Sequence, residues 1–387
     1  MIYQEKMIIP LQAIEYFKPP EELNGQYGRN RSDTKQKLID ADTDLDAIHS
    51  WLNEFIDSPQ TYRNYRKEAE RLLLWSLIER EKPFSSLNRD DFLAYEHFIS
   101  DPQPKSRWCG PRVARNKETW KPFIGSLKAS SQHQALIICQ ALLSYLVEAG
   151  YLAANPLVLR RRKRKTPVSQ ESTERFLEQS LWQYLLDFID TLPKHTSREI
   201  AHYERNRYLF SLLYLLGPRV SEVANHTMGS FIEQRGRWWW RVTGKGDKTV
   251  KIPVNDDMLE ALSRYRQYYG FSARPNPDEK IPLIMSIKGS GSITANMIYR
   301  IVKQTVNAAS DELQHRDPIN AEKLKQASTH WFRHTAITHQ ADAGIELRYL
   351  NKSARHEKID TTAGYLHADE EQWHNAMQKH NLNYKIK

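Results

Sequence analysis

Hydrophobic positions recur with a helical period from Asp44 to about Pro156 and again beyond Glu174. In the first stretch Ile48, Leu52 and Phe55 form one stripe, and the later apolar positions stop at Gly150. Those later positions at helical spacing are Leu72, Leu73, Trp75, Leu136, Leu142, Leu143, Leu146 and Val147. A three-to-four residue repeat that ends at glycine is typical of amphipathic helices. The stretch therefore predicts a helical domain.

The second stretch begins with helices and then changes to short segments suited to strands. Residues 238–243 and 248–254 are rich in Trp, Val, Thr and Ile, and Gly244-Lys245-Gly246-Asp247 between them is typical of a hairpin turn. Helical spacing resumes over 257–268, 295–309 and 329–343. The fold class expected is mainly α with a small antiparallel β-sheet in the second domain.

The pattern divides the chain into five parts. Residues 1–43 hold Pro19-Pro20, glycines and scattered charges with little periodicity, which indicates an arm or extension with one short helix at best. The parts expected are an N-terminal arm (1–43), a helical domain (44–158), a basic linker (159–173), a second domain (174–370) and a tail (371–387). In the tail Trp373, Met377 and Leu382 favour a helix that docks either on a neighbouring protomer or on its own domain.

Composition narrows the class of protein. The 387-residue chain has no apolar run near the roughly 20 residues of a membrane-spanning helix, and its start lacks a signal-peptide pattern. Its only cysteines, Cys109 and Cys139, supply neither a disulfide framework nor a four-cysteine zinc site. We expect a cytoplasmic protein that does not enter a membrane. The net charge of +9 favours an anionic partner, nucleic acid first.

The basic residues gather in two places. One is a run of six consecutive positive charges: Arg160, Arg161, Arg162, Lys163, Arg164 and Lys165. The other is the segment 101–131, with seven Lys or Arg against two acids, whose candidate DNA contacts are Arg112, Arg115, Lys117 and Lys121. The alternatives are a solubilising linker and a solvated loop. The run lies between two domains able to clamp a duplex, which favours salt-dependent contact with phosphates.

Three residues of the predicted helix 329–343 suggest chemistry on a phosphodiester. His330, Arg333 and His334 occupy positions i, i+3 and i+4, on one face. A guanidinium can donate two parallel hydrogen bonds to phosphate oxygens, and an imidazole can donate or accept a proton. The two histidines also have the spacing of a metal pair, but Trp331 stands where a zinc protease carries its glutamate. We therefore expect no metal.

Further candidates lie before and after this helix. Arg219 follows the apolar helix 208–216 and the Gly217-Pro218 pair, and Lys245 stands between two glycines at the hairpin tip. Near the end of the chain, Tyr365 comes nine residues after His356. Each of these residues alone would be ordinary.

Together, in this order, Arg219, Lys245, His330, Arg333, His356 and Tyr365 resemble the tyrosine recombinase, or phage integrase, family. The motifs cover about residues 174–370. The stretch 44–156 is similar, more loosely, to the helical core-binding domain that precedes the catalytic domain in this family. The resemblance implies a two-domain clamp on double-stranded DNA recombination sites, cleaving and rejoining strands without metal or nucleotide cofactor.

The resemblance also implies a role for each residue. Tyr365 is the nucleophile that forms a 3′-phosphotyrosyl bond. Arg219 and Arg333 neutralise the non-bridging oxygens, His330 and His356 assist through hydrogen bonds and proton movement, and Lys245 is the general acid. The family further implies a homotetramer on synapsed DNA, a monomer or weak oligomer when free, and an accessory directionality factor as a further partner.

Two positions depart from the family pattern. Arg355 stands where the family usually has glycine before its second histidine, and Pro218 where it often has leucine. Arg355 either alters the local turn or adds a DNA contact. The alternatives to a recombinase are a non-enzymatic DNA-binding protein on the same scaffold, a topoisomerase-like or hairpin-resolving phosphotyrosine enzyme, and a metal-dependent nuclease. The host element stays open between a phage, a transposon, a genomic island and a chromosome-dimer system.

Overall fold

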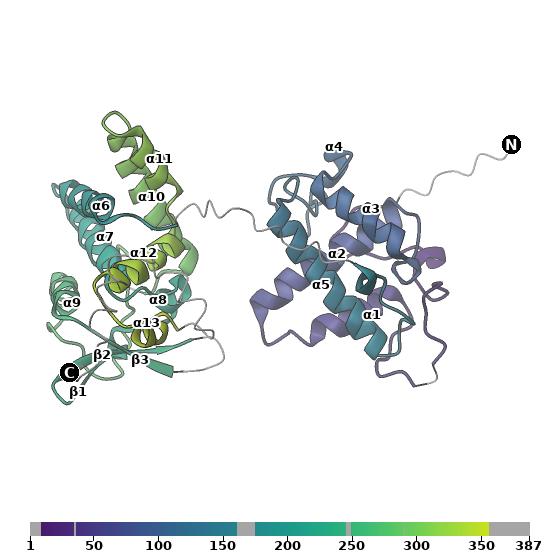
Figure 1. Ribbon diagram of the computed structural model, residues 1–387, viewed down its shortest axis with the longest axis horizontal. Coiled ribbons are helices and arrows are strands. Elements are labelled where there is room, and N and C mark those ends of the chain that lie inside the picture. The colour runs from purple at the N-terminus through teal and green to yellow at the C-terminus, as the bar shows by residue number, and fades with distance from the viewer. Residues whose placement is uncertain (1–8, 35, 161–174, 245–248, 290, 356–387) are drawn as a thin grey trace, which may run out of the picture. The chain divides into compact units, whose positions relative to one another are not determined.

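The chain folds into two compact units, Met1–Thr166 and Pro167–Lys387 (Figure 1). The computed structural model describes residues 9–34, 36–160, 175–244, 249–289 and 291–355. The division between the units falls inside the segment expected as the basic linker.

Unit 1 is helical. Its α-helices are α1 (Asp44–Asn53), α2 (Pro59–Ile78), α3 (Arg89–Ser100), α4 (Lys105–Trp108) and α5 (Ala129–Glu148). Its short 3₁₀ helices are η1 (Glu21–Leu23), η2 (Phe84–Ser86) and η3 (Pro156–Leu159). The stripes predicted from the sequence form its core, where Leu72, Trp75 and Leu142 are buried. Residues 9–43 contain the one short helix η1 but are more than an extension, because Ile14 and Phe17 are buried in the same core.

Polar residues fix where several helices begin. Thr43 starts α1 and Asn88 starts α3, and each accepts a hydrogen bond from the backbone N–H three residues on. Asp46 and Asp91 bond back to the N-cap backbone, which completes a capping box at both helices. These caps satisfy N–H groups that the first turn of a helix leaves without partners.

Unit 2 is mainly helical with one small sheet. Its helices are α6 (Gln179–Thr191), α7 (Ser197–Leu215), α8 (Val220–Asn225), η4 (Met228–Ser230), α9 (Asp256–Tyr268), α10 (Ala295–Leu313), α11 (Pro318–Gln326), α12 (Thr329–Asp342) and α13 (Leu347–Ala354). The helices predicted over 257–268, 295–309 and 329–343 are confirmed, and α10 continues to Leu313.

The sheet is antiparallel with the strand order β1-β2-β3. Strands β2 (Arg237–Thr243) and β3 (Thr249–Pro253) are the two predicted strands, and β1 (Phe231–Gln234) was not expected from the sequence. Trp240 pairs with Ile252, and both are buried together with Phe231. The alternation of buried and exposed side chains along β2 presents this apolar face to the core of unit 2.

Helix α12 lies in the middle of unit 2 and packs against α7 (Figure 1). Phe332 on α12 makes edge contacts with Trp182 and Phe210, which come from α6 and α7. Gly217 ends the α7 segment at φ +53°, and a Cβ there would lie 3.3 Å from the Cβ of Ala336 on α12. Glycine therefore permits both the left-handed turn and the close approach of the two segments.

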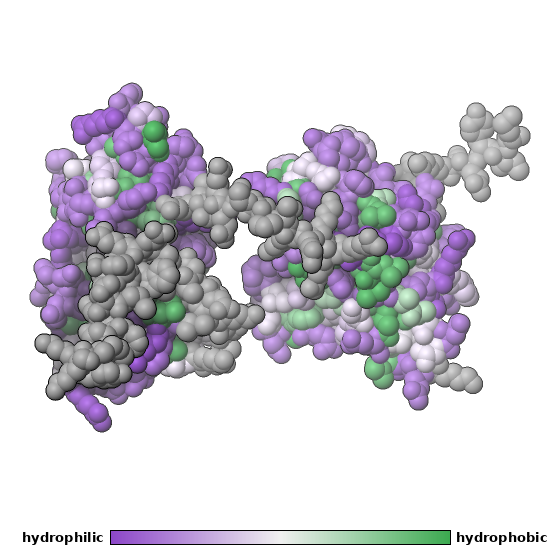
Figure 2. All heavy atoms as spheres, viewed as in Figure 1, coloured by the Kyte–Doolittle hydropathy of each residue, from purple (hydrophilic) through white to green (hydrophobic). Residues whose placement is uncertain are grey.

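Among the helices that the structure describes, none is long and apolar enough to cross a bilayer. Where Figure 2 colours the surface, hydrophilic residues are more common than hydrophobic ones, which form small patches.

Candidate active site

Arg219 is held at the start of α8. Its backbone N–H donates to Glu222 Oε2 at 2.6 Å, so a glutamate one turn into the helix closes back on the N-cap. The guanidinium donates from Nη1 to Glu222 Oε1 at 3.1 Å and from Nη2 to the carbonyl of Arg355 at 3.1 Å. The side chain stays 41% exposed, so a ligand can reach it.

Arg333 lies on the buried side of α12. Its guanidinium donates to the carbonyl of Gly217 at 2.6 Å and to the carbonyl of Ala354. The residue is only 4% exposed. Successive residues of a helix are turned by about 100°, so Arg333 sits about 60° from His330 around the axis and faces the core flank. His330, Arg333 and His334 thus share one side of α12, but Arg333 is buried whereas His330 is exposed.

The two arginines meet on one short piece of backbone. Arg219 binds the carbonyl of Arg355 and Arg333 binds the carbonyl of Ala354, the residue before it. Residues far apart in the sequence are therefore joined at the end of α13, directly before His356. His356 and Tyr365 lie outside the described residues.

Arg355 takes the left-handed conformation, with φ 54° and ψ 43°, as the C-cap of α13. This is the conformation in which glycine is favoured, so the backbone turn is kept even though the side chain differs. The guanidinium does not extend into solvent, because it bonds to both carboxylate oxygens of Glu222, and its side chain is 6% exposed. The altered turn expected for Arg355 is therefore not seen, and its guanidinium is bound by Glu222.

Glu222 is the residue of this cluster that the sequence did not single out. Its side chain is 4% exposed, and its two oxygens accept hydrogen bonds from both Arg219 and Arg355. The available signal was the spacing of three residues between Arg219 and Glu222, which is that of a capping box.

His226 connects α8 to the hairpin. Its Nε2 accepts a hydrogen bond from the backbone N–H of Thr243 at 2.9 Å, and its Nδ1 lies 2.8 Å from the carbonyl of Glu222. With Nδ1 as donor, one neutral imidazole satisfies both partners. These two hydrogen bonds hold the end of β2 next to α8, the helix that Arg219 caps. In the sequence, Lys245 follows two residues after Thr243. Lys245 itself lies outside the described residues.

The rings of His330 and His334 lie side by side on α12, with centroids 4.3 Å apart and their planes tilted by 35°. In the part of the chain that the structure describes, no three His, Cys, Asp or Glu side chains are grouped to hold a metal ion. Neighbouring protein atoms displace part of the water around the imidazole of His330, which disfavours its charged form and lowers its pKa below the ordinary 6.5. The positive charges of Arg333, Arg175 and Arg219 lower the pKa further.

We expect the imidazole of His330 to titrate below pH 6.5 and to be neutral at pH 7. Because the unfolded chain takes up this proton at the ordinary pKa, His330 contributes stability above pH 6.5 that is lost as the pH falls through the lower, folded-state pKa. NMR titration of the ring protons, assigned with His330→Gln, measures the midpoint. Arg333→Ala should move it upward, and a wild-type midpoint at or above 6.5 would contradict the assignment.

The candidate DNA contacts of unit 1 fall into two groups. Arg112 and Lys117 are exposed, as a phosphate contact requires. The others bind within the protein: Arg115 binds the carboxylates of Glu15 and Glu70, Lys121 binds the carbonyl of Ser106, and Arg160 binds Glu96 at 3.0 Å.

The burial of Glu70 explains the geometry around Arg115, since a carboxylate of 1% exposure needs a cation. Burial still raises the pKa of Glu70, and Arg115 opposes that shift. Arg115 therefore stabilises the fold of unit 1 through its ion pairs, and its contact with DNA stays a prediction. Arg161, Arg162, Lys163, Arg164 and Lys165 lie outside the described residues.

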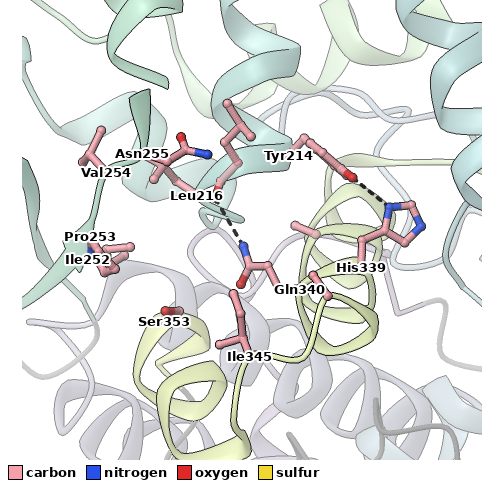
Figure 3. A pocket seen from close by; sticks show the side chains of 13 residues that line it. Tyr214, Leu216, Ile252, Pro253, Val254, Asn255, His339, Gln340, Ile345 and Ser353 are labelled. Carbon is pink, nitrogen blue, oxygen red and sulfur yellow. Dashed lines mark hydrogen bonds between the residues drawn. The ribbon is translucent and has the colours of Figure 1, made fainter. Parts of the chain in front are cut away.

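A groove of about 380 Å³ runs between the ends of α7 and β3 and the helices α12 and α13 (Figure 3). Tyr214 shares a 3.0 Å hydrogen bond with Nδ1 of His339, and Gln340 donates to the carbonyl of Leu215 at 3.3 Å. Both bonds tie α12 to the end of α7. They hold the helix of Arg333 in register with the loop that leads to Arg219.

Comparison with known proteins assigns the family. Residues 175–372, more than half of the chain, match the model of the phage integrase family. The chain therefore belongs to this family, the tyrosine recombinases, which cleave and rejoin DNA. The recombinase fold and activity inferred from the motifs are confirmed.

Proteins with similar sequences are tyrosine recombinases as well. The chain is 25% identical over 316 residues to the tyrosine recombinase XerC of Thermodesulfovibrio yellowstonii, covering 81% of this chain and 87% of the relative. It is 26% identical over 248 residues to XerD of Neisseria meningitidis, covering 63% and 75%. The match to XerC of Corynebacterium efficiens is 31% identical over 165 residues, and spans 43% of this chain and only 47% of that protein.

Solved structures show the same fold. The XerH site-specific recombinase bound to difH substrate superposes with a TM-score of 0.55 at 16% identity, over 85% of this chain and 83% of that one. The Tn1549 transposon integrase in complex with transposon right end DNA gives 0.59 at 16% identity, over 86% and 98%.

Proposed function

We propose that this chain is a site-specific recombinase in which Tyr365 attacks the scissile phosphate and forms a 3′-phosphotyrosyl bond. The attack releases a 5′-hydroxyl, and a second 5′-hydroxyl reverses the step on the exchanged strand. Because the covalent bond conserves the energy of the phosphodiester, no ATP is required.

The other residues act on the charge and the protons of this transfer. Arg219 and Arg333 stabilise the negative charge that develops on the non-bridging oxygens, the term usually worth most in such a reaction. Lys245 protonates the leaving oxygen, and His330 and His356 assist through hydrogen bonds and proton movement.

The observation that carries this proposal is the convergence of Arg219 and Arg333 on the carbonyls of Arg355 and Ala354. The backbone segment they bind leads directly to His356 and, nine residues later, to Tyr365. His226 links Thr243, at the end of the strand that leads to Lys245, to α8, the helix that Arg219 caps. On the proposed mechanism, these two segments bring Lys245, His356 and Tyr365 to the arginine pair.

We further propose that the partner is a double-stranded DNA recombination site, with four protomers on two synapsed duplexes. The XerH and Tn1549 integrase structures, which contain DNA, support the first part of this proposal. The net charge of +9 and the basic run 160–165 supply the nonspecific attraction to phosphates. The tail 371–387, expected to dock on its own domain or on a neighbouring protomer, lies outside the described residues.

The test is covalent trapping on nicked candidate sites in the presence of EDTA, followed by sequencing of the junction. A protein–DNA adduct that is unaffected by the chelator and joined through a 3′-phosphate is the expected result. Exchanged partner strands identify a recombinase, whereas topoisomers or closed hairpin ends would identify a related phosphotyrosine enzyme. Dependence on a divalent metal would reject the proposal.

A further inference from the structure

Arg355 has a backbone conformation that arginine rarely adopts. With φ at 54° it is one of few described residues other than glycine at positive φ. A glycine would adopt this turn without strain, so the side chain has to compensate for an unfavourable backbone. Its contacts show what it does there.

The guanidinium of Arg355 forms a two-point ion pair with Glu222. Nε donates to Oε1 at 3.1 Å and Nη2 donates to Oε2 at 2.7 Å. The two side chains are 6% and 4% exposed, so water screens the pair little. Nη1 donates to the carbonyl of Ser353 at 2.8 Å, which holds the guanidinium plane against the end of α13. The described partners of this side chain thus all lie within the protein.

The same carboxylate contacts Arg219. Oε1 accepts from Nη1 of Arg219 as well as from Arg355, and Oε2 accepts from the backbone N–H of Arg219. Without Arg355, the negative charge of Glu222 would cancel the positive charge of Arg219 at short range. With Arg355, the three side chains carry a net charge of one positive unit.

Arg355 also approaches the second arginine. Its Nη2 lies 3.4 Å from the carbonyl of Gly217, the acceptor of Nη1 of Arg333. Its own carbonyl accepts from Arg219, and the carbonyl before it accepts from Arg333. Arg355 therefore shares an acceptor with each of the two arginines, Glu222 with Arg219 and the Gly217 carbonyl with Arg333.

We propose that Arg355 is a positioning residue that neutralises Glu222, so that the charge of Arg219 remains available to the scissile phosphate. Glu222 can then orient Arg219 by accepting hydrogen bonds from its backbone and its side chain, without weakening the electrostatic attraction between that arginine and an anion. This inference rests on the proposed role of Arg219 in strand cleavage.

The test is a double-mutant cycle of Arg355→Gly and Glu222→Gln, read as the single-turnover rate of covalent adduct formation on saturating nicked DNA. Glycine suits the left-handed backbone, and glutamine keeps the shape of the glutamate without its charge. We expect Arg355→Gly to slow cleavage about 10-fold to 100-fold, somewhat less than direct loss of a charge-stabilising donor. DNA affinity should change little, because the side chain is buried.

The decisive comparison is between the double variant and Glu222→Gln alone. Once the carboxylate is neutral, Arg355 has nothing to offset, so the two rates should agree within a few-fold. Arg355→Lys should retain most of the wild-type rate, and Arg348→Ala, which removes an exposed cation from the same helix, serves as the matched control for net charge.

Four results would overturn the proposal. Two concern single variants: a rate for Arg355→Gly within twofold of wild type, or an inactive Glu222→Gln. The other two are an equal loss of rate with Arg348→Ala, and a substitution of Arg355 that slows Glu222→Gln by the same factor as it slows the wild type. If Arg355→Gly does not fold, the comparison of cleavage rates between the double variant and Glu222→Gln still tests the proposal. A failure of the proposed function would be distinguishable from a failure of this inference. In that case the wild-type protein itself would form no adduct through Tyr365.

Discussion

Replacing Tyr365 with phenylalanine is expected to abolish covalent attachment to DNA and to leave DNA affinity near its wild-type value. The phenolic oxygen is the atom that attacks phosphorus, and the substitution removes it while keeping the ring. Loss of a nucleophile lowers the rate by about 10⁴-fold or more in enzymes with a covalent intermediate. Adducts on nicked sites measure the first effect, and a binding titration at fixed salt measures the second.

Tyr349→Phe is the matched control for this experiment. Tyr349 lies on α13, is 47% exposed, and precedes the same backbone segment. Its loss of a hydroxyl should leave the rate of adduct formation unchanged. Covalent adducts formed by Tyr365→Phe at a rate near that of wild type would show that another residue is the nucleophile, and would end the proposed mechanism.

The helical elements could be predicted because their sequences carry a regular period and clear ends. Helix α12 begins after Ser328 and ends before Gly344, and the hairpin strands are marked by β-branched and aromatic residues around two glycines. Strand β1 was missed because it has four residues, of which only Phe231 is buried. So short a segment has too few positions to show alternation.

The network around Glu222 could not be predicted, since it depends on contacts between segments distant in the sequence. The sequence marks Arg355 as unusual, but only the fold shows that its guanidinium pairs with a carboxylate on α8. Arg115 illustrates the same limit in unit 1. It lies in a basic segment that suggests DNA, yet two carboxylates from other segments bind its guanidinium.

Arg333→Ala is expected to reduce both cleavage and stability, whereas Arg219→Ala should reduce cleavage alone. Both arginines are proposed to stabilise charge on the phosphate, and losing one such donor costs about 10²-fold to 10³-fold in rate. Arg333 also supplies hydrogen bonds to the carbonyls of Gly217 and Ala354 in a buried setting. The Gly217 carbonyl would keep only the 3.4 Å contact of Arg355, and the Ala354 carbonyl would lose the donor that Arg333 provides. A buried acceptor without a donor costs about 1–3 kcal/mol, so the unfolding free energy should fall by about that amount.

Arg219 differs because its side chain is 41% exposed and Glu222 keeps Arg355 as a partner when Arg219 is removed. Its replacement by alanine should change the unfolding free energy by less than about 1 kcal/mol. Urea unfolding of both variants, set beside their single-turnover cleavage rates, separates the two effects. An equal stability loss in the two variants would mean that the buried bonds of Arg333 do not hold the end of α7 to α13. Normal cleavage by Arg333→Ala would remove that residue from the active site.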